Sequence, residues 1–261
     1  MVEEVDLFPC AIQEAKFLKS QDRIVFCGNQ LNSLSQITVV RHTEGKSVVE
    51  TTCSLRGSAY CLEVCSLRDG MLLACGLNSG NGEGSIVLCN VRHDGMGYAD
   101  IEVIPDGMET LMPLSPIQSS LASLAFDEYN HVLAQGRDNG VIMCNDLSTG
   151  QLIHQFKSDS TGIATLSYKH AATLICTTRS LQCPMKIYDL RMSNPEVYRV
   201  FKTDATDRTQ LDAYYTAVCS HKINETVACG SSKGDILTWD LRSSGDVAAS
   251  RADGVHCDKG E

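Results

Sequence analysis

At 261 residues the chain is long enough for one large all-β domain or two ordinary ones, and its 43% hydrophobic content is ample for a core. The formal net charge of −10 is spread along the chain without a Lys/Arg cluster, which disfavours direct nucleic-acid binding and binding to an anionic membrane surface. No apolar run approaches the roughly 20 residues of a membrane span, and the acidic start MVEEVDLF is unlike a signal peptide, so we expect a soluble intracellular protein without membrane insertion.

The thirteen cysteines are expected to be reduced thiols, because their number is odd, the chain is large and no export signal is present. Several occupy one equivalent strand position, where Cys behaves as a small buried hydrophobe. These cysteines are Cys27, Cys75 and Cys229, each before a glycine, and Cys176 close to the same position in a fourth repeat. Cys61 and Cys65 have the spacing C-x-x-x-C rather than C-x-x-C, and no metal site is expected.

The most informative stretch is 226–240, which reads TVACGSSKGDILTWD. Two short apolar runs, 226–230 and 236–239, flank the polar turn 231–234. This pattern predicts a β-hairpin closed by the pair Trp239-Asp240. The same pattern recurs four times upstream, and repeats of this length decide the fold.

The first two repeats each predict four short strands. The strands expected in the first are 12–18, 24–28, 37–41 and 47–53, and those in the second are 60–64, 72–76, 86–90 and 101–104. The segment 2–8 is a further strand candidate. Gly80, Gly82 and Gly84 resemble a dinucleotide fingerprint, but a strand follows them instead of a helix, so a glycine-rich hairpin turn is expected.

The last three repeats follow the same plan. Their expected strands are 121–126, 132–136, 141–146 and 151–156; then 163–168, 173–177, 185–191 and 197–201; then 215–219, the reference hairpin and a fourth strand starting at 247–250. The pair Asn139-Gly140 predicts a type I′ turn in the third repeat.

The repeat spacing was counted between positions equivalent to the Trp-Asp pair. These positions are Val40, Cys89, the pair Asn145-Asp146, the pair Tyr188-Asp189 and the pair Trp239-Asp240. The intervals are 49, 56, 43 and 51 residues. A period of about 40 to 45 residues, lengthened by insertions, with four strands per unit is typical of a β-propeller. The chain resembles the WD-repeat family over essentially its whole length, with YDLR at 188–191 and WDLR at 239–242 as the specific motifs.

This resemblance implies an all-β WD-repeat β-propeller domain over residues 1–261, with five recognisable four-stranded blades. The buried polar tetrad usual in the family is largely absent, since no Gly-His dipeptide opens a repeat and Asp138 alone fits among the turn aspartates. Blade stability is therefore expected to rest mainly on apolar packing between adjacent sheets.

The number of blades leaves two alternatives. WD-repeat proteins commonly close with seven blades, which would need at least about 280 residues, so we expect an incomplete seven-bladed propeller. The alternative is a closed five-bladed ring in which the segment 2–8 supplies the outer strand of the last blade.

No catalytic arrangement can be assigned from the seven histidines, and His131 and His221 fall near strand ends or turns. Phosphate-binding, zinc-protease and serine-hydrolase motifs are absent from the sequence. The sequon at Asn224 abuts a buried strand and is interpreted as chance. We therefore expect no enzyme activity, cofactor or small-molecule substrate.

Two loops are candidates for function. The loop 105–116, PDGMETLMPLSP, is too rich in Pro and Gly for a strand and is a candidate partner loop. Its apolar side chains are Met108, Leu111, Met112 and Leu114. The alternative is that these side chains pack back over the propeller edge. The acidic loop 203–215 is expected to be solvated.

A propeller without catalytic residues is expected to be a scaffold that binds other proteins, by analogy of fold. Within the WD-repeat family, the run 116–242 resembles the small propeller nucleoporin of the Y-shaped scaffold of the nuclear pore. The matching stretches are IYDLRMSNPEV at 187–197 and CSHKINETVACGSSKGDILTWDLR at 219–242. This resemblance implies scaffold nucleoporins as partners, a place at the nuclear envelope, and roles in pore assembly and transport. The rival hypothesis is a WD-repeat adaptor of a ubiquitin ligase or trafficking complex, which would be cytoplasmic.

Overall fold

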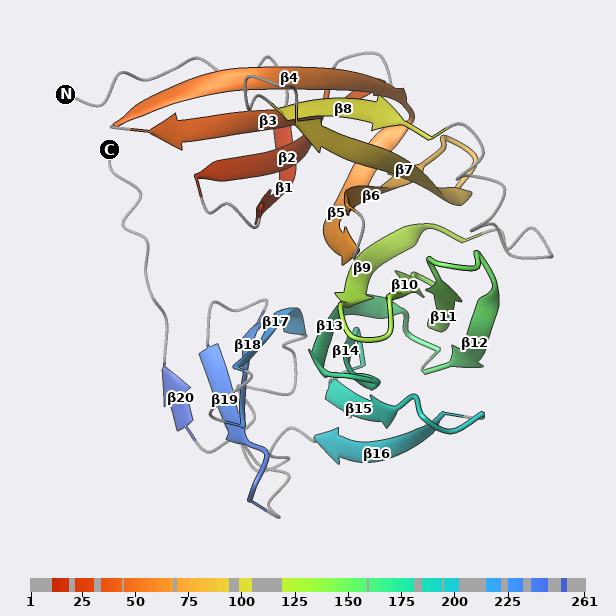
Figure 1. Cartoon of the computed structure of the whole chain (residues 1–261). Coiled ribbons are helices and arrows are strands. Elements are labelled where there is room, and N and C mark those ends of the chain that lie inside the picture. The colour runs from red at the N-terminus through yellow and green to blue at the C-terminus, as the bar shows by residue number, and fades with distance from the viewer. Residues whose placement is uncertain are drawn as a thin grey trace. The chain divides into compact units, whose positions relative to one another are not determined.

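Alternating apolar residues over five repeats fold into five separate antiparallel sheets in the computed structural model (Figure 1). The structure describes residues 11–18, 22–30, 34–43, 45–67, 70–93, 99–104, 119–158, 160–180, 185–193, 195–201, 215–221, 225–231, 236–243 and 250–252. Each sheet has four strands in sequence order, so each is a meander of hairpins. The prediction of five four-stranded units is confirmed.

We call the five sheets blades 1 to 5 and keep the strand labels of Figure 1. Blade 1 contains β1 (Ala11–Phe17), β2 (Arg23–Asn29), β3 (Leu34–Thr43) and β4 (Lys46–Arg56). Blade 2 contains β5 (Ser58–Leu67), β6 (Gly70–Asn78), β7 (Gly84–His93) and β8 (Ala99–Val103). Blade 3 contains β9 (Leu121–Asp127), β10 (Val132–Arg137), β11 (Val141–Asp146) and β12 (Leu152–Lys157). Blade 4 contains β13 (Ile163–His170), β14 (Thr173–Thr178), β15 (Met185–Asp189) and β16 (Glu196–Phe201). Blade 5 contains β17 (Tyr215–His221), β18 (Thr226–Ser231), β19 (Ile236–Asp240) and β20 (Ser250–Ala252).

The chain divides into two compact units. Unit 1 comprises Met1–Leu133 and Asn145–Leu152, and unit 2 comprises Ala134–Cys144 and Ile153–Glu261. The strands of blade 3 are shared between them. A single domain over 1–261 and the number of blades in the closed ring both stay predictions.

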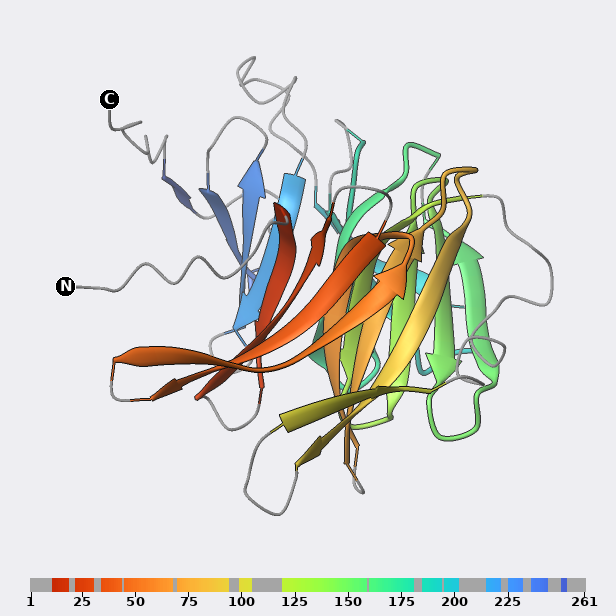
Figure 2. The same cartoon turned by 90° about the horizontal axis from the view of Figure 1, so that it is seen from above.

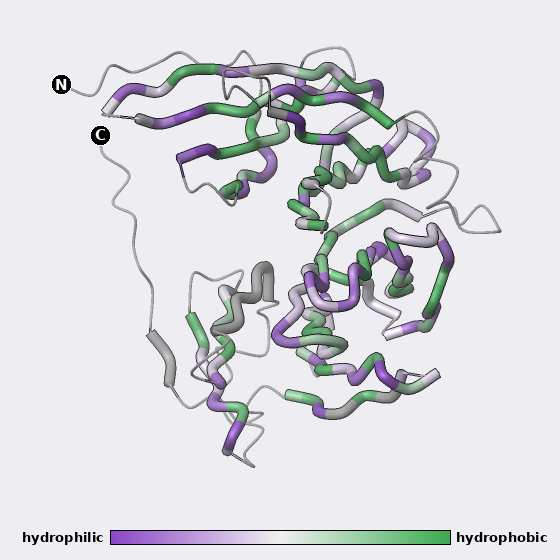
Figure 3. Tube along the Cα trace, viewed as in Figure 1, coloured by the Kyte–Doolittle hydropathy of each residue, from purple (hydrophilic) through white to green (hydrophobic). Residues whose placement is uncertain are grey.

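The cores lie between successive sheets, because each strand alternates its side chains between two faces. In unit 1, Val25, Cys27 and Ile37 of blade 1 belong to the same buried cluster as Leu73 and Cys75 of blade 2. A second cluster joins blade 2 to β9 and β10. Figure 3 shows hydrophobic and hydrophilic stretches alternating along the strands.

The unit 2 core joins blades 4 and 5. Phe201 of β16 and Trp239 of β19 are among its largest buried side chains. Ile187 lies in the same cluster. In these three clusters one repeat buries its apolar face against the next one, as expected for a repeat architecture.

The turn between β10 and β11 differs from the expected type. The Gly140 N–H donates to the Arg137 carbonyl at 3.0 Å, and Gly140 has φ +83°. Asn139 is not among the residues with positive φ, which a type I′ turn requires. The hairpin prediction is confirmed, but the type I′ prediction is wrong. The chain instead makes a type I turn over Arg137–Gly140 followed by glycine in the left-handed region, the usual three-residue hairpin loop.

Polar side chains also fasten blades of unit 1 together. The Asn29 amide donates to the Ala59 carbonyl at 3.0 Å and accepts from the Ala59 N–H at 2.7 Å. Asn78 makes the same pair of bonds with Leu121, at 3.0 and 2.8 Å. Each asparagine thus satisfies a strand-end N–H and carbonyl of the next blade, so apolar packing is supplemented by bonds that the sequence reading missed.

A buried carboxylate adds a charged contact at blade 1. Glu50 sits at a bulge of β4, and its fully buried side chain pairs with Arg23 at 2.7 Å and Arg41 at 3.2 Å. The Ala99 N–H of β8 also donates to it, at 3.2 Å. The long β3–β4 hairpin, orange in Figure 2, is therefore tied to blade 2.

The structure also bears on the predicted glycine-rich turn, the last predicted strand and the expected lack of a membrane span. The segment between β6 and β7 is a hairpin turn closed by Ser79, whose N–H donates to the Glu83 carbonyl at 2.9 Å, as expected for the glycine-rich stretch. The last strand of blade 5 is described over Ser250–Ala252, and the rest of its predicted start, 247–249, lies outside the described residues. No helix long and apolar enough to cross a membrane occurs among the described residues.

Candidate interaction sites

The strand register aligns the positions equivalent to the Trp-Asp pair. Trp239 pairs with Val227, Tyr188 with Leu174 and Cys89 with Leu73. In each case the partner lies two residues before the cysteine named in the sequence analysis. In blade 1 the residue two before Cys27 is Val25, which pairs with Val39, so the equivalent position lies one residue before Val40. Val40 itself pairs with Ile24 and is 4% exposed.

The aromatic members of this position pack on the outer strand of the preceding blade. The Trp239 ring lies edge-on to Phe201 with centroids 5.7 Å apart. The Tyr188 ring lies 4.8 Å from Phe156, and its hydroxyl donates to Ser158 at 2.7 Å. Both side chains are buried inside the repeat.

The following aspartate shapes the next turn in three blades. The Oδ1 atoms accept backbone N–H bonds from Ser148, Arg191 and Arg242, at 2.7, 3.0 and 2.9 Å. The accepting residues are Asp146, Asp189 and Asp240. Asn145, before Asp146, is buried at 2% exposure.

Two of these aspartates also accept hydrogen bonds from an arginine side chain. Bonds from Arg191 lower the pKa of Asp189 to about 2, and bonds from Arg242 lower that of Asp240 to about 2. In the YDLR and WDLR motifs the aspartate and the arginine therefore bind each other within one turn.

A left-handed residue precedes the second strand in the same three blades. His131, Ala172 and Glu225 have φ values of 56, 57 and 51°. Their carbonyls accept from the leucine N–H that follows each aspartate, at 2.9, 2.8 and 2.7 Å. This hydrogen bond joins two turns within one blade, and it recurs in all three blades.

Two of the buried cysteines, Cys89 and Cys144, are held in the thiol form. Burial raises the pKa of Cys89 to about 12 and that of Cys144 to about 12, so the reactive thiolate is disfavoured. Cys27, Cys75, Cys176 and Cys229 are buried, as predicted for small hydrophobes. No cluster of three or more metal-ligating side chains occurs in the part of the chain that the structure describes.

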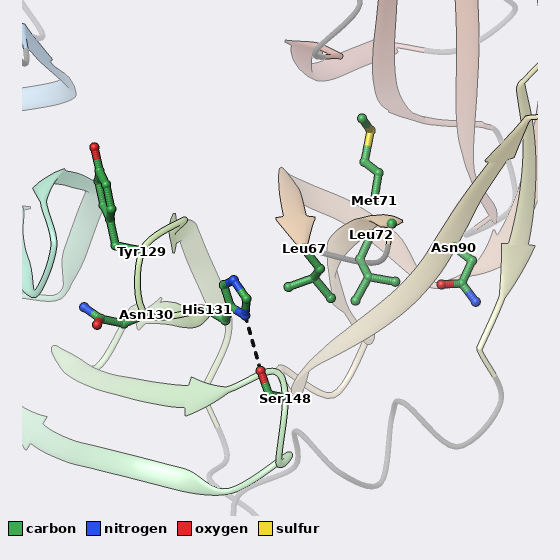
Figure 4. A pocket seen from close by; sticks show the side chains of 9 residues that line it. Leu67, Met71, Leu72, Asn90, Tyr129, Asn130, His131 and Ser148 are labelled. Atoms are coloured by element: carbon green, nitrogen blue, oxygen red, sulfur yellow. Dashed lines mark hydrogen bonds between the residues drawn. The ribbon is translucent and has the colours of Figure 1, made fainter.

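Unit 1 has a cavity of about 640 Å³ between blades 2 and 3, which we call the blade 2–3 notch (Figure 4). Its lining residues are Leu67, Gly70, Met71, Leu72, Asn90, Tyr129, Asn130, His131 and Ser148. His131 Nδ1 lies 3.4 Å from the Ser148 hydroxyl and its ring stacks near Phe126 at 6.5 Å. His131 thus has a structural role in its turn, and the notch is lined by neutral groups and a histidine.

Unit 2 has a smaller cavity of about 280 Å³ between blades 4 and 5, the blade 4–5 notch. Its lining residues are Lys169, His170, Thr173, Ile187, Tyr188, Asp189, Arg191, Arg199, Glu225 and Leu241. It occupies the same place in the repeat, because Asp189 and Glu225 correspond to Asn90 and His131 of the other notch. Sequence reasoning missed both notches, since each is assembled from two blades.

Other candidates lie outside the described residues. They are the partner loop with Met108, Leu111, Met112 and Leu114, the acidic loop up to residue 214, the segment 2–8 and the sequon residue Asn224. The side chain of His221 is likewise not described.

The family comparison concerns the C-terminal part of the chain. The family model described as "Nucleolar protein 10-like, N-terminal domain", a β-propeller, matches residues 112–254. These 143 residues are more than half of the 261. The chain belongs to this family. No curated protein sequence is similar enough to the chain to count as a relative.

Solved structures agree with this nucleolar protein 10-like propeller in fold. The β-propeller domain of Myceliophteria thermophila Cps50 (Swd1) has a TM-score of 0.66 at 13% identity, covering 93% of this chain and 73% of that one. U3-55K has a TM-score of 0.61 at 11% identity, covering 94% and 65%. A chain of the mitotic checkpoint complex has a TM-score of 0.51 at 15% identity, covering 69% and 46%. This protein therefore spans less than two thirds of the last two, and at these identities the likeness concerns the fold alone. With its five sheets, the chain is a WD-repeat β-propeller.

Proposed function

We propose that this propeller is a non-catalytic platform that holds other proteins together in the nucleus. The observation that carries the proposal is the match of residues 112–254 to a propeller family named after a nucleolar protein. Rigid blades with notches between them suit simultaneous contact with several partners. The sequence also contains no catalytic motif to which an enzyme activity could be attached.

The place in the nucleus has two candidates. The family name favours a nucleolar assembly. The stretches 187–197 and 219–242 favour a structural nucleoporin of the Y-shaped nuclear pore scaffold. The ubiquitin-ligase or trafficking adaptor, which would be cytoplasmic, is the third reading and rests on the fold alone.

Live-cell imaging of the fluorescently tagged chain separates these readings. A nucleolar assembly predicts signal inside nucleoli, and a pore scaffold predicts a continuous nuclear rim. Diffuse cytoplasmic signal at endogenous expression would contradict both nuclear candidates. Quantitative affinity capture then identifies partners: ribosome-assembly proteins support the first candidate, scaffold nucleoporins the second, and ligase or vesicle components the third.

A further inference from the structure

We infer that the blade 2–3 notch binds an extended segment of a partner protein. The notch takes up one large apolar side chain of that segment, and the Asn90 amide hydrogen-bonds the adjoining backbone. The inference rests on the proposed function, because it names the chemistry of a partner segment for the platform. The cavity of about 640 Å³ lies within unit 1 and falls in the roughly 300–1,000 Å³ range typical of ligand pockets, so it has room for an aromatic side chain.

Asn90 is a polar side chain of the notch that the fold itself does not use. It holds the repeat position of Asp189 and Asp240, whose carboxylates are engaged by a backbone N–H and by an arginine. In blade 2 the strand β7 continues to His93 instead of turning here, and the Asn90 side-chain amide has no hydrogen-bond partner within the part of the chain that the structure describes. The amide therefore still offers both a donor and an acceptor.

Polar groups on the opposite wall of the notch are already engaged within blade 3. The Asn130 Nδ2 atom donates to an Asp127 carboxylate oxygen at 2.8 Å, and His131 Nδ1 lies 3.4 Å from the Ser148 hydroxyl. These contacts hold the blade 3 wall in place. Among these amides, Asn90 is thus the one positioned to bind a partner.

The chain shows twice how an asparagine amide binds an adjoining strand. Asn29 and Asn78 each donate to the carbonyl and accept from the N–H of one residue in the next blade, at distances of 3.0 and 2.7 Å for the first and 3.0 and 2.8 Å for the second. The bound residues, Ala59 and Leu121, belong to the strands β5 and β9. An asparagine in this protein therefore recognises extended backbone, and the same contact by Asn90 would hold a partner by its backbone.

Apolar side chains form the blade 2 wall of the notch. Leu67 and Leu72 pack on the buried cluster between blades 2 and 3, and Met71 packs on the cluster between blades 1 and 2. Figure 4 shows Leu67 and Leu72 on the blade 2 side and Tyr129, which is 69% exposed, on the blade 3 side. Lys, Arg, Asp and Glu are absent from the described lining, so a charged side chain would lose hydration there without gaining a partner. A phenylalanine would instead gain burial and a methionine–aromatic contact.

Methionine-methyl NMR of the full chain tests the notch, because Met71 reports from its lining while Met143 and Met185 are buried elsewhere. The probes are the capped peptide Ser-Gly-Thr-Phe-Thr-Gly-Ser, the same peptide with Gln for Phe, and the same peptide with N-methyl groups on Phe and both Thr residues. We expect the first peptide to shift the Met71 signal and to leave the other two signals in place. The second and third peptides should each bind at least about tenfold more weakly, because one lacks the apolar side chain and the other lacks the backbone donors.

The variant Asn90→Asp removes the amide donor, keeps an acceptor and introduces the residue type that Asp189 and Asp240 supply in other blades, so we expect it to fold. It should weaken the first peptide about tenfold, while Asn81→Asp, the same change on the exposed turn between β6 and β7, should leave binding within about twofold. Thermal unfolding of each variant checks the fold. If Asn90→Asp does not fold, Tyr129→Ser replaces it and should weaken the peptide about threefold.

No shift of the Met71 signal at millimolar peptide, equal binding of the three peptides, or unchanged binding in the folded notch variants would overturn the proposal. Toluene that shifts the Met71 signal with the affinity of the first peptide would also overturn it, in favour of a small apolar ligand. Affinity capture separates this proposal from the proposed function. Partners retained by a chain that binds no peptide leave the platform intact and remove the notch, whereas a chain that captures no protein removes the platform itself.

Discussion

At the scale of single residues, the pair that closes each repeat performs two separate tasks. Trp239 and Tyr188 fill space against the preceding blade, and the aspartates that follow them organise a turn. These roles explain why the aromatic position tolerates Cys89 and Val39 in other blades, where smaller side chains also remain buried. The Trp-Asp motif therefore stabilises the fold, and we expect substitutions in it to change stability.

Trp239→Ala is expected to lower the free energy of unfolding by roughly 3 to 5 kcal/mol, the usual cost of truncating a buried tryptophan. Trp239 is 1% exposed, whereas Ile236 on the same strand is 42% exposed. Ile236→Ala is therefore the matched control and should cost about 0.5 kcal/mol or less. Urea unfolding measures both, and an equal effect of the two substitutions would refute the packing role.

The aspartate turns should make part of the stability dependent on acid pH. The folded-state pKa values of Asp189 and Asp240 are about 2, below the roughly 3.9 of an unfolded chain. Their contribution is present above about pH 4 and is lost as the pH falls through about 2.

The double variant Asp189→Asn/Asp240→Asn should therefore unfold at lower urea concentration than the wild type at pH 5, with the gap shrinking toward pH 2. Urea midpoints across this range measure the gap. A gap that stays constant would show that the arginine bonds contribute nothing that depends on ionisation.

At the scale of elements, the strands were predictable because each apolar run repeats with the period of a half-buried strand. Two adjacent apolar residues, Val39 and Val40, left the register of blade 1 ambiguous by one position, since no Trp-Asp pair marks it. The Asn29 and Asn78 contacts join residues 30 and 43 positions apart. Local periodicity carries no information about such contacts, nor about notches formed by two blades.

The loop 105–116 remains a proposed partner-docking element between β8 and β9. Replacing it with a Gly/Ser linker of equal length should remove at least one captured partner and leave the melting temperature nearly unchanged, because the blades keep their own cores. A second variant with Met108, Leu111, Met112 and Leu114 changed to Ser separates side-chain recognition from loop length. Full retention of partners with a lowered melting temperature would show that these side chains only pack on the propeller.

At the scale of the whole molecule, the chain is a β-propeller with a net charge of −10, and we propose that it binds other proteins. The measurement that tests this claim most directly is affinity capture of the full chain from nuclear extract, with and without nuclease, followed by quantitative mass spectrometry. We predict that the same protein partners are recovered in both samples, since a chain with a net charge of −10 is unsuited to binding nucleic acid directly. Loss of every partner after nuclease treatment, or capture of none in either sample, would contradict the account.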